Sequence, residues 1–179
     1  MTVALAAAGT LIALLAVLAA AMAAGIVINV VTRVPYAACP PAQIERIFDH
    51  LNLPPGTRFY DLGCGDGRVV FAAAARGARA TGFELQPLTY LRAKLTQLLR
   101  YQNADIRWGD FRHANLRDAD CVFCFLVGAV MPQVGAWLHR QLKPGTTVVS
   151  YGFAIPNWQA SSVLTPDHAG GSATYVYAA

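Results

Sequence analysis

The feature that most restricts the fold is an uncharged apolar run near the N-terminus, from Val3 to Val31. A membrane-spanning helix takes about 20 such residues, so this run can cross a bilayer with some tilt. A cleaved signal peptide is the alternative, but the run lacks a basic start and exceeds the usual apolar region of roughly 7–15 residues. We therefore expect a retained single-pass membrane anchor over residues 1–33. Arg33 directly after the run predicts that the following domain is cytoplasmic.

The charge and the cysteines argue against two common kinds of partner. The net charge of +4 comes without a basic run or an aromatic-basic stripe, so we expect proximity to anionic lipid and no nucleic-acid partner. Cys121 and Cys124 form the one CxxC pair, but residues three apart on a strand point to opposite faces. No second pair completes a zinc site, and the histidines lack metal-ligand spacing, so we expect no metal.

After a Pro-rich linker over residues 34–41, residues 42–179 are predicted to form one domain of alternating strands and helices. This alternation predicts an α/β fold with a doubly wound, mostly parallel, Rossmann-like sheet and a C-terminal β-hairpin. Ligands of such folds bind outside the carboxyl ends of the strands. The expected strands are 58–62, 78–83, 105–108, 120–127, 146–151, 162–164 and 174–177, and the expected helices are 42–51, 68–75, 87–101 and 129–142.

A glycine-rich segment, Tyr60-Asp-Leu-Gly-Cys-Gly-Asp-Gly-Arg68, ends the first strand and opens the next helix. Gly63, Gly65 and Gly67 permit a tight turn and close approach of a ligand to the backbone. The helix N-terminus behind them favours a negative group such as a ligand carboxylate. A dinucleotide fingerprint requires glycine at position 68, which is an arginine here. Asp61 suits the amino group of a bound amino acid better than a pyrophosphate, because its charge has the wrong sign for a phosphate.

Two further acidic residues follow the second and third predicted strands. Glu84 lies 21 residues after Gly63, a spacing at which a carboxylate accepts hydrogen bonds from ribose hydroxyls. Asp110 lies just after the third strand, where a carboxylate can accept from an adenine amino group and the adjacent Phe111 can flank a purine ring. The alternatives are a helix cap for Asp61, a solvated loop position for Glu84 and a turn position for Asp110.

These three stretches, in this order, resemble the S-adenosylmethionine (SAM) binding motifs of class I methyltransferases. The resemblance implies that Asp61 lies near the methionine amino group, that Glu84 holds the ribose and that Asp110 contacts adenine. It also implies that the three glycines face the methionine moiety. SAM is therefore the expected cofactor, and the chain is expected to be an enzyme.

A narrower resemblance is to the small membrane-anchored protein-lysine methyltransferases that modify the c-ring protein of ATP synthase and the adenine nucleotide translocase. It comes from the apolar anchor, Val34-Pro-Tyr36, the glycine segment, Lys143-Pro-Gly-Thr-Thr-Val-Val-Ser150 and Asn157-Trp158. It implies a protein substrate near the bilayer. A lipid or small-molecule methyltransferase and a non-catalytic SAM-binding assembly factor are the alternatives. Tyr36, Phe125 and Trp158 are candidate channel residues for the acceptor, although core packing is the better explanation for Phe125.

Overall fold

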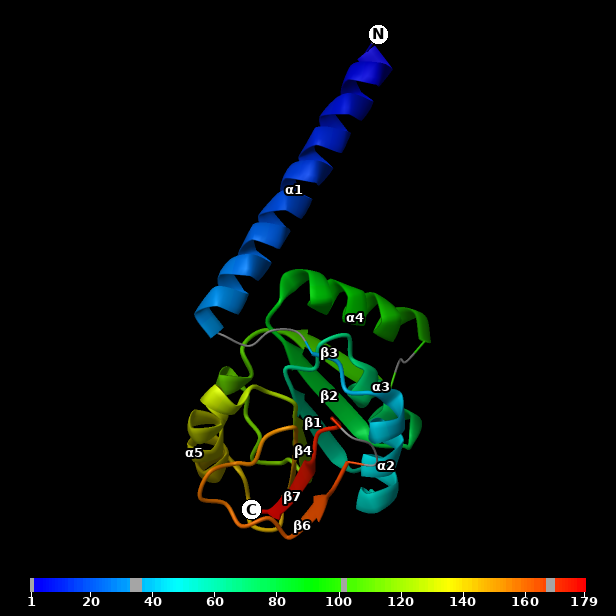
Figure 1. The fold of residues 1–179 in the computed structure, drawn as a ribbon. Helices are drawn as coiled ribbons and strands as arrows, with labels where there is room; N and C mark the ends of the chain where they lie inside the picture. Colours follow the sequence, from blue (N-terminus) through cyan, green and yellow to red (C-terminus); the bar gives the residue numbers. More distant parts are fainter. Residues whose placement is uncertain (1, 33–36, 101–102, 167–169) are drawn as a thin grey trace.

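The computed structural model describes residues 2–32, 37–100, 103–166 and 170–179. A long helix, α1 (Thr2–Thr32), projects from one end of a compact α/β domain (Figure 1). The segment Ala6–Val27 within it has a mean hydropathy of 2.6 and is long and apolar enough to cross a membrane. A signal sequence passes the same test of length and composition.

The domain is built on a seven-stranded sheet with strand order β3-β2-β1-β4-β5-β7-β6. The first five strands pair in parallel, and β7 runs antiparallel between β5 and β6. The predicted doubly wound fold and the C-terminal antiparallel pair are therefore confirmed. The strands are β1 (Arg58–Leu62), β2 (Arg79–Glu84), β3 (Ala104–Trp108), β4 (Cys121–Cys124), β5 (Thr147–Tyr151), β6 (Ser162–Leu164) and β7 (Thr174–Ala178).

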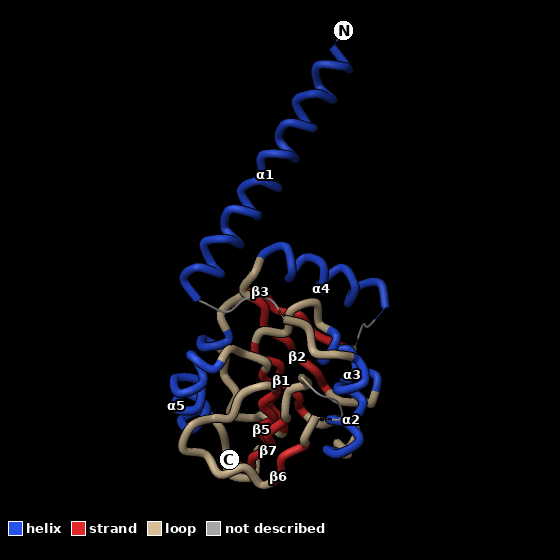
Figure 2. The backbone as a smooth tube through the Cα atoms, in the orientation of Figure 1, coloured by secondary structure: helices blue, strands red, loops and turns tan. Residues whose placement is uncertain are grey.

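Helices cover both faces of this sheet, as parallel strands require (Figure 2). On one face lie α2 (Pro41–Leu51), α3 (Arg68–Ala75) and α4 (Pro87–Arg100), which contribute to one apolar core cluster. On the other lies α5 (Met131–Gln141), which shares a second cluster with the C-terminal segment. Cys121 belongs to the first cluster and Cys124 to the second, so the two thiols do face opposite sides of the sheet.

Strand β4 is shorter than the predicted strand over 120–127. Its pairing ends where Cys124 meets Ser150. The apolar run continues for another reason, since Leu126 is buried in the second cluster and Phe125 packs on Tyr151 with ring centroids 4.6 Å apart. The hydrophobic pattern therefore recorded burial correctly but not strand pairing.

The helix predicted over 129–142 is also divided differently. A 3-10 turn over Gly128–Val130 comes first, and α5 then begins at Met131. Pro132 lies in its first turn, where a missing backbone N–H costs nothing because that donor has no partner within the helix.

Candidate active site

The loop between β1 and α3, which we call the glycine bend (residues 63–67), lies at the carboxyl edge of the sheet. Gly63 and Gly67 both have φ of 84°, a region that other residues rarely adopt. A Cβ atom on Gly67 would lie 2.7 Å from the Phe71 ring, so this position has no space for a side chain. The backbone N–H groups of Gly63 and Cys64 both donate to the Phe83 carbonyl, which ties the bend to β2. Glycine is thus required here for both conformation and space.

Glu84, the last residue of β2, is joined to this bend directly. One carboxylate oxygen accepts from the Gly65 backbone N–H at 2.8 Å and the other from the Gln86 N–H at 2.7 Å. The side chain is only 7% exposed. Burial raises the pKa of Glu84 above its usual value, although these backbone hydrogen bonds oppose the shift. The structure therefore brings Glu84 and the glycine bend together, as the motif spacing predicted.

Asp61 is the most strongly perturbed group at this edge of the sheet. It is 2% exposed, and no hydrogen bond joins its carboxylate to any other residue in the described part of the chain. Burial raises the pKa of Asp61 well above its usual value, and the negative charges of Glu84 and Asp66 raise it further. A buried carboxylate without a partner is costly, and perturbed groups of this kind cluster at functional sites. Its environment is suited to a positively charged ligand group.

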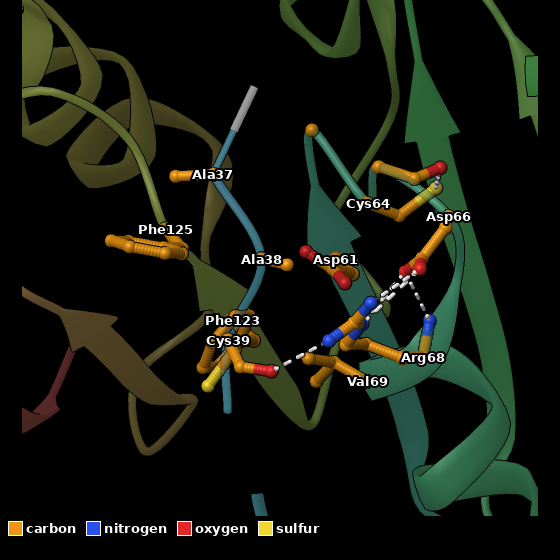
Figure 3. A pocket seen from close by; sticks show the side chains of 12 residues that line it. Ala37, Ala38, Cys39, Asp61, Cys64, Asp66, Arg68, Val69, Phe123 and Phe125 are labelled. Carbon is orange, nitrogen blue, oxygen red and sulfur yellow. Dashed lines mark hydrogen bonds and ion pairs between the residues drawn. The ribbon is translucent and has the colours of Figure 1, made fainter. Parts of the chain in front are cut away.

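A pocket opens directly over Asp61 (Figure 3). The Asp61 carboxylate points toward it, and small residues of the bend and of the chain after the linker form much of its wall. The aromatic side of the pocket comes from β4 and the residue that follows it. Its lining residues are Ala37, Ala38, Cys39, Asp61, Gly63, Cys64, Gly65, Asp66, Arg68, Val69, Phe123 and Phe125.

The role of Arg68 was not predicted from the sequence. Its guanidinium forms a two-pronged ion pair with Asp66, with distances of 2.9 Å and 2.6 Å. It also donates to the Cys39 backbone carbonyl at 3.3 Å, which fastens the segment before α2 to the glycine bend. The spacing of two residues between Asp66 and Arg68 at a helix start was the available signal for this pair.

The remaining two predicted residues lie outside this pocket. Asp110 caps a 3-10 turn (Phe111–His113) by accepting from the Arg112 backbone N–H at 2.9 Å, and it is ion-paired with the Arg112 side chain. Burial raises the pKa of Asp110, but the hydrogen bonds and charge of Arg112 outweigh it and leave that pKa below its usual value. The Phe111 ring meets the Trp137 ring edge-on at 5.6 Å. The roles of Asp110 and Phe111 toward adenine stay predictions.

The three candidate channel residues have different positions. Phe125 lines the pocket as well as packing on Tyr151, so core packing accounts for only part of its role. Trp158 packs against Tyr177 in the second core cluster and is not among the pocket residues. Tyr36 lies outside the described residues.

The amino-acid end of SAM fits this arrangement on two observations. Its ammonium would neutralise the buried, unpartnered Asp61, and the small residues at 37, 38, 63 and 65 leave the approach to the bend unobstructed. Among the described residues, no group of three or more histidine, cysteine or acidic side chains is arranged to hold a metal ion. The sheet edge therefore has the chemistry of an amino-acid and ribose site.

Comparison with known proteins agrees with this assignment. Residues 61–162 match the family described as the ANTKMT methyltransferase domain. The chain is 32% identical over 139 residues to a protein-lysine N-methyltransferase of Saccharolobus islandicus, covering 75% of this chain and 86% of that protein. It is 35% identical over 135 residues to the mouse adenine nucleotide translocase lysine N-methyltransferase, covering 74% and 58% of the two chains. It is 31% identical over 139 residues to the human lysine N-methyltransferase that acts on the c-ring protein of ATP synthase, covering 76% and 57%. The aligned region thus spans a little over half of the two mammalian relatives.

Solved structures add the cofactor. An RNA methyltransferase from Salinibacter ruber in complex with S-adenosyl-L-homocysteine (SAH) has a TM-score of 0.73 and 28% identity, covering 79% of this chain and 93% of that one. A SAM-dependent methyltransferase from Geobacter sulfurreducens, also bound to SAH, has a TM-score of 0.55 and 25% identity, covering 63% and 48%. The chain therefore belongs to the ANTKMT methyltransferase domain family and is a SAM-dependent methyltransferase.

Proposed function

We propose that this enzyme transfers a methyl group from SAM to a lysine side chain of a protein in or at a membrane. The named substrates of its mammalian relatives, the adenine nucleotide translocase and the c-ring protein of ATP synthase, support lysine as the acceptor. The apolar helix α1 supports a location at a bilayer. In this assignment Asp61 holds the cofactor's amino group, Glu84 its ribose, and Asp110 with Phe111 its adenine.

The observation that carries the membrane part of this proposal is the position of the pocket along the chain. Its wall begins at Ala37, five residues after Thr32, the last residue of α1. An extended chain spans at most about 3.6 Å per residue, so the pocket wall lies within about 18 Å of the end of this helix. A lysine just outside the bilayer is therefore within reach, and anchoring raises its effective concentration at the site.

The proposed domain division follows from the same segments. Residues 1–33 form the anchor, 34–41 the linker and 42–179 the methyltransferase domain, which faces the cytoplasm because Arg33 follows the span. A retained anchor predicts that the protein purified from membranes has the mass of the full chain. A product shortened at its N-terminus, recovered in the soluble fraction, would instead identify a signal sequence.

The chemistry asks little covalent work of the protein. SAM supplies an electrophilic methyl group on a sulfonium, and the acceptor nitrogen must attack it in line. A lysine must first lose a proton, against a reference pKa of about 10.4. A desolvated approach lowers that pKa, as does the nearby positive charge of the cofactor, so no dedicated base is required. The aromatic side of the pocket, Phe123 and Phe125, would supply such an approach by excluding water.

The test is to incubate membranes containing the full chain with methyl-labelled SAM and to separate protein, lipid, RNA and small molecules. We expect label in protein, released as methyl-lysine on hydrolysis, and lost in an Asp61→Asn variant. Label confined to lipid or small molecules would refute the lysine proposal. Label in RNA would refute it too and would match the activity named for the Salinibacter ruber protein.

A further inference from the structure

Helix α4 carries a stripe of leucines that faces away from the domain. The five side chains recur at helical spacing along one face and are between 38% and 72% exposed, while Ala93 on the opposite face is buried against the sheet. Soluble domains rarely leave such a continuous apolar surface uncovered, so it marks a contact with another apolar phase. We call this surface the leucine stripe; it consists of Leu88, Leu91, Leu95, Leu98 and Leu99.

The charges on α4 are of one sign. The helix contains Arg92, Lys94 and Arg100 and no acidic residue. On a helical projection Arg92 and Lys94 flank the two edges of the leucine stripe. The Lys94 ammonium donates to the Ile106 carbonyl at 3.1 Å, so it lies at the border between the stripe and the sheet. An apolar face edged by basic residues is the pattern of a helix that lies in the plane of an anionic membrane surface.

The position of α4 relative to α1 fits that surface. The Gln86 side chain, one residue before α4, donates to the Gly25 backbone carbonyl at 3.0 Å. Gly25 lies two residues before Val27, where the candidate span ends. The start of α4 is thereby held at the level of the span's end, and α4 crosses the end of the domain from which α1 projects (Figure 1).

An exposed aromatic pair extends the same surface. Trp108, at the end of β3, is 64% exposed and stacks with Tyr90 of α4 at 6.4 Å between ring centroids. Its indole N–H donates to the Leu85 carbonyl, so the polar edge of the ring is satisfied while the rest stays open. Tryptophan and tyrosine gather at the level of the lipid headgroups because they have one apolar and one polar part.

We propose that α4 is a second membrane contact, an in-plane helix whose leucine stripe enters the headgroup boundary of an anionic bilayer. The contact rests on the proposal that α1 spans that bilayer, and it goes beyond it. Two contacts fix the orientation of the domain, whereas one span leaves it free to swivel on its linker. The site then faces a defined height above the membrane, which restricts acceptors to lysines at that height.

The four cysteines are buried, so an added surface cysteine can be labelled selectively in the full chain. We would place a fluorescent probe at Leu95→Cys in α4 and reconstitute the protein in vesicles of phosphatidylcholine with phosphatidylglycerol. The matched control is Val163→Cys in β6, which is 50% exposed and lies far from α4 (Figure 1). A probe at Ile12→Cys in α1 reports separately whether the span is inserted. Nitroxide lipids quench probes in the bilayer, and iodide quenches probes in water.

We expect the probe at position 95 to be quenched by nitroxide lipids, at a depth of about 5–10 Å into the boundary, and the probe at 163 to be quenched by iodide alone. Iodide quenching at 95 equal to that at 163 would overturn the α4 contact. Shielding from both quenchers at 95 would also overturn it, because a protein or a second copy would then cover the stripe. Failure of the α1 anchor would show separately, as iodide quenching at position 12, and methyl transfer in the same vesicles tests the proposed activity independently.

Discussion

Replacing Asp61 with asparagine keeps the shape of the side chain and removes its charge. In the protein without cofactor this charge is a burden, because the carboxylate is buried, has no hydrogen-bond partner in the described structure and lies near Glu84 and Asp66. With the cofactor bound, the same charge would face an ammonium. The substitution should therefore have opposite effects on stability and on binding, a combination that a purely structural role does not produce.

The sizes follow from general costs of buried polar groups. A hydrogen bond to a charged group contributes about 1.5–3 kcal/mol, so the dissociation constant for SAH should rise about 10- to 150-fold. An unsatisfied buried polar group costs about 1–3 kcal/mol. Relief of about 1 kcal/mol corresponds to a rise of roughly 2–4 °C in Tm for a domain of this size. We therefore expect Asp61→Asn to be more thermostable than the wild type without cofactor.

The pH dependence gives a further check. The pKa of Asp61 is raised in the folded protein, so between its usual value and the raised one the folded state binds more protons than the unfolded state. Wild-type stability should thus fall relative to Asp61→Asn as pH rises through that interval. A cationic ligand favours ionised Asp61, so SAH affinity should rise with pH in the wild type and not in the variant. Calorimetry and thermal unfolding of the full chain in nanodiscs measure both. A variant that loses stability but binds SAH normally would refute the reasoning.

Three further substitutions and one labelling test examine the rest of the account. Glu84→Gln turns an amide nitrogen toward a backbone N–H, and should cost about 1–3 kcal/mol of unfolding free energy in denaturant titrations as well as weakening SAH binding. Gly67→Ala should abolish SAH binding, whereas Gly145→Ala, with the same φ of 84° but open space around it, should cost only about 1 kcal/mol of unfolding free energy and leave binding intact. Asp120→Asn weakens ion pairs to partly exposed Lys143 and Arg58, so it should cost no more than about 1 kcal/mol. Those partners lower the pKa of Asp120, so this stability is present near neutral pH and is lost as pH falls below the usual aspartate range. A thiol reagent should label no cysteine in the native protein and all four after unfolding, because burial raises the pKa of Cys39, Cys121 and Cys124 to about 12 and that of Cys64 well above its usual value.

The parts of the fold that follow from local chemistry were predictable from the sequence. Strand 58–62 and helix 68–75 have the predicted bounds, because a short apolar strand ends at a glycine bend and the helix that follows it is stopped by Gly77. The end of β4 was not predictable. Phe125 and Leu126 are apolar for packing against Tyr151 and the second core cluster, and an apolar run does not reveal which of its residues pair in a sheet.

The site was predictable where it depends on strand ends. Asp61 and Glu84 end adjacent parallel strands, so their meeting at the glycine bend follows from the fold class. The contact of Arg68 with the Cys39 carbonyl was not predictable, because it depends on how the segment before α2 crosses the bend. The membrane-facing side of α4 was visible in the sequence as leucine spacing, but only the structure shows that the sheet leaves this face uncovered.

The central claim is that the glycine bend with its two acidic neighbours holds the amino-acid and ribose parts of the cofactor. A structure of the full chain solved with SAH tests it most directly. We expect ligand density over residues 63–67, with its amino group against Asp61 and its ribose hydroxyls on Glu84. Density at another edge of the sheet, with the Glu84 to Gly65 hydrogen bond unchanged and Asp61 still without a partner, would contradict the account.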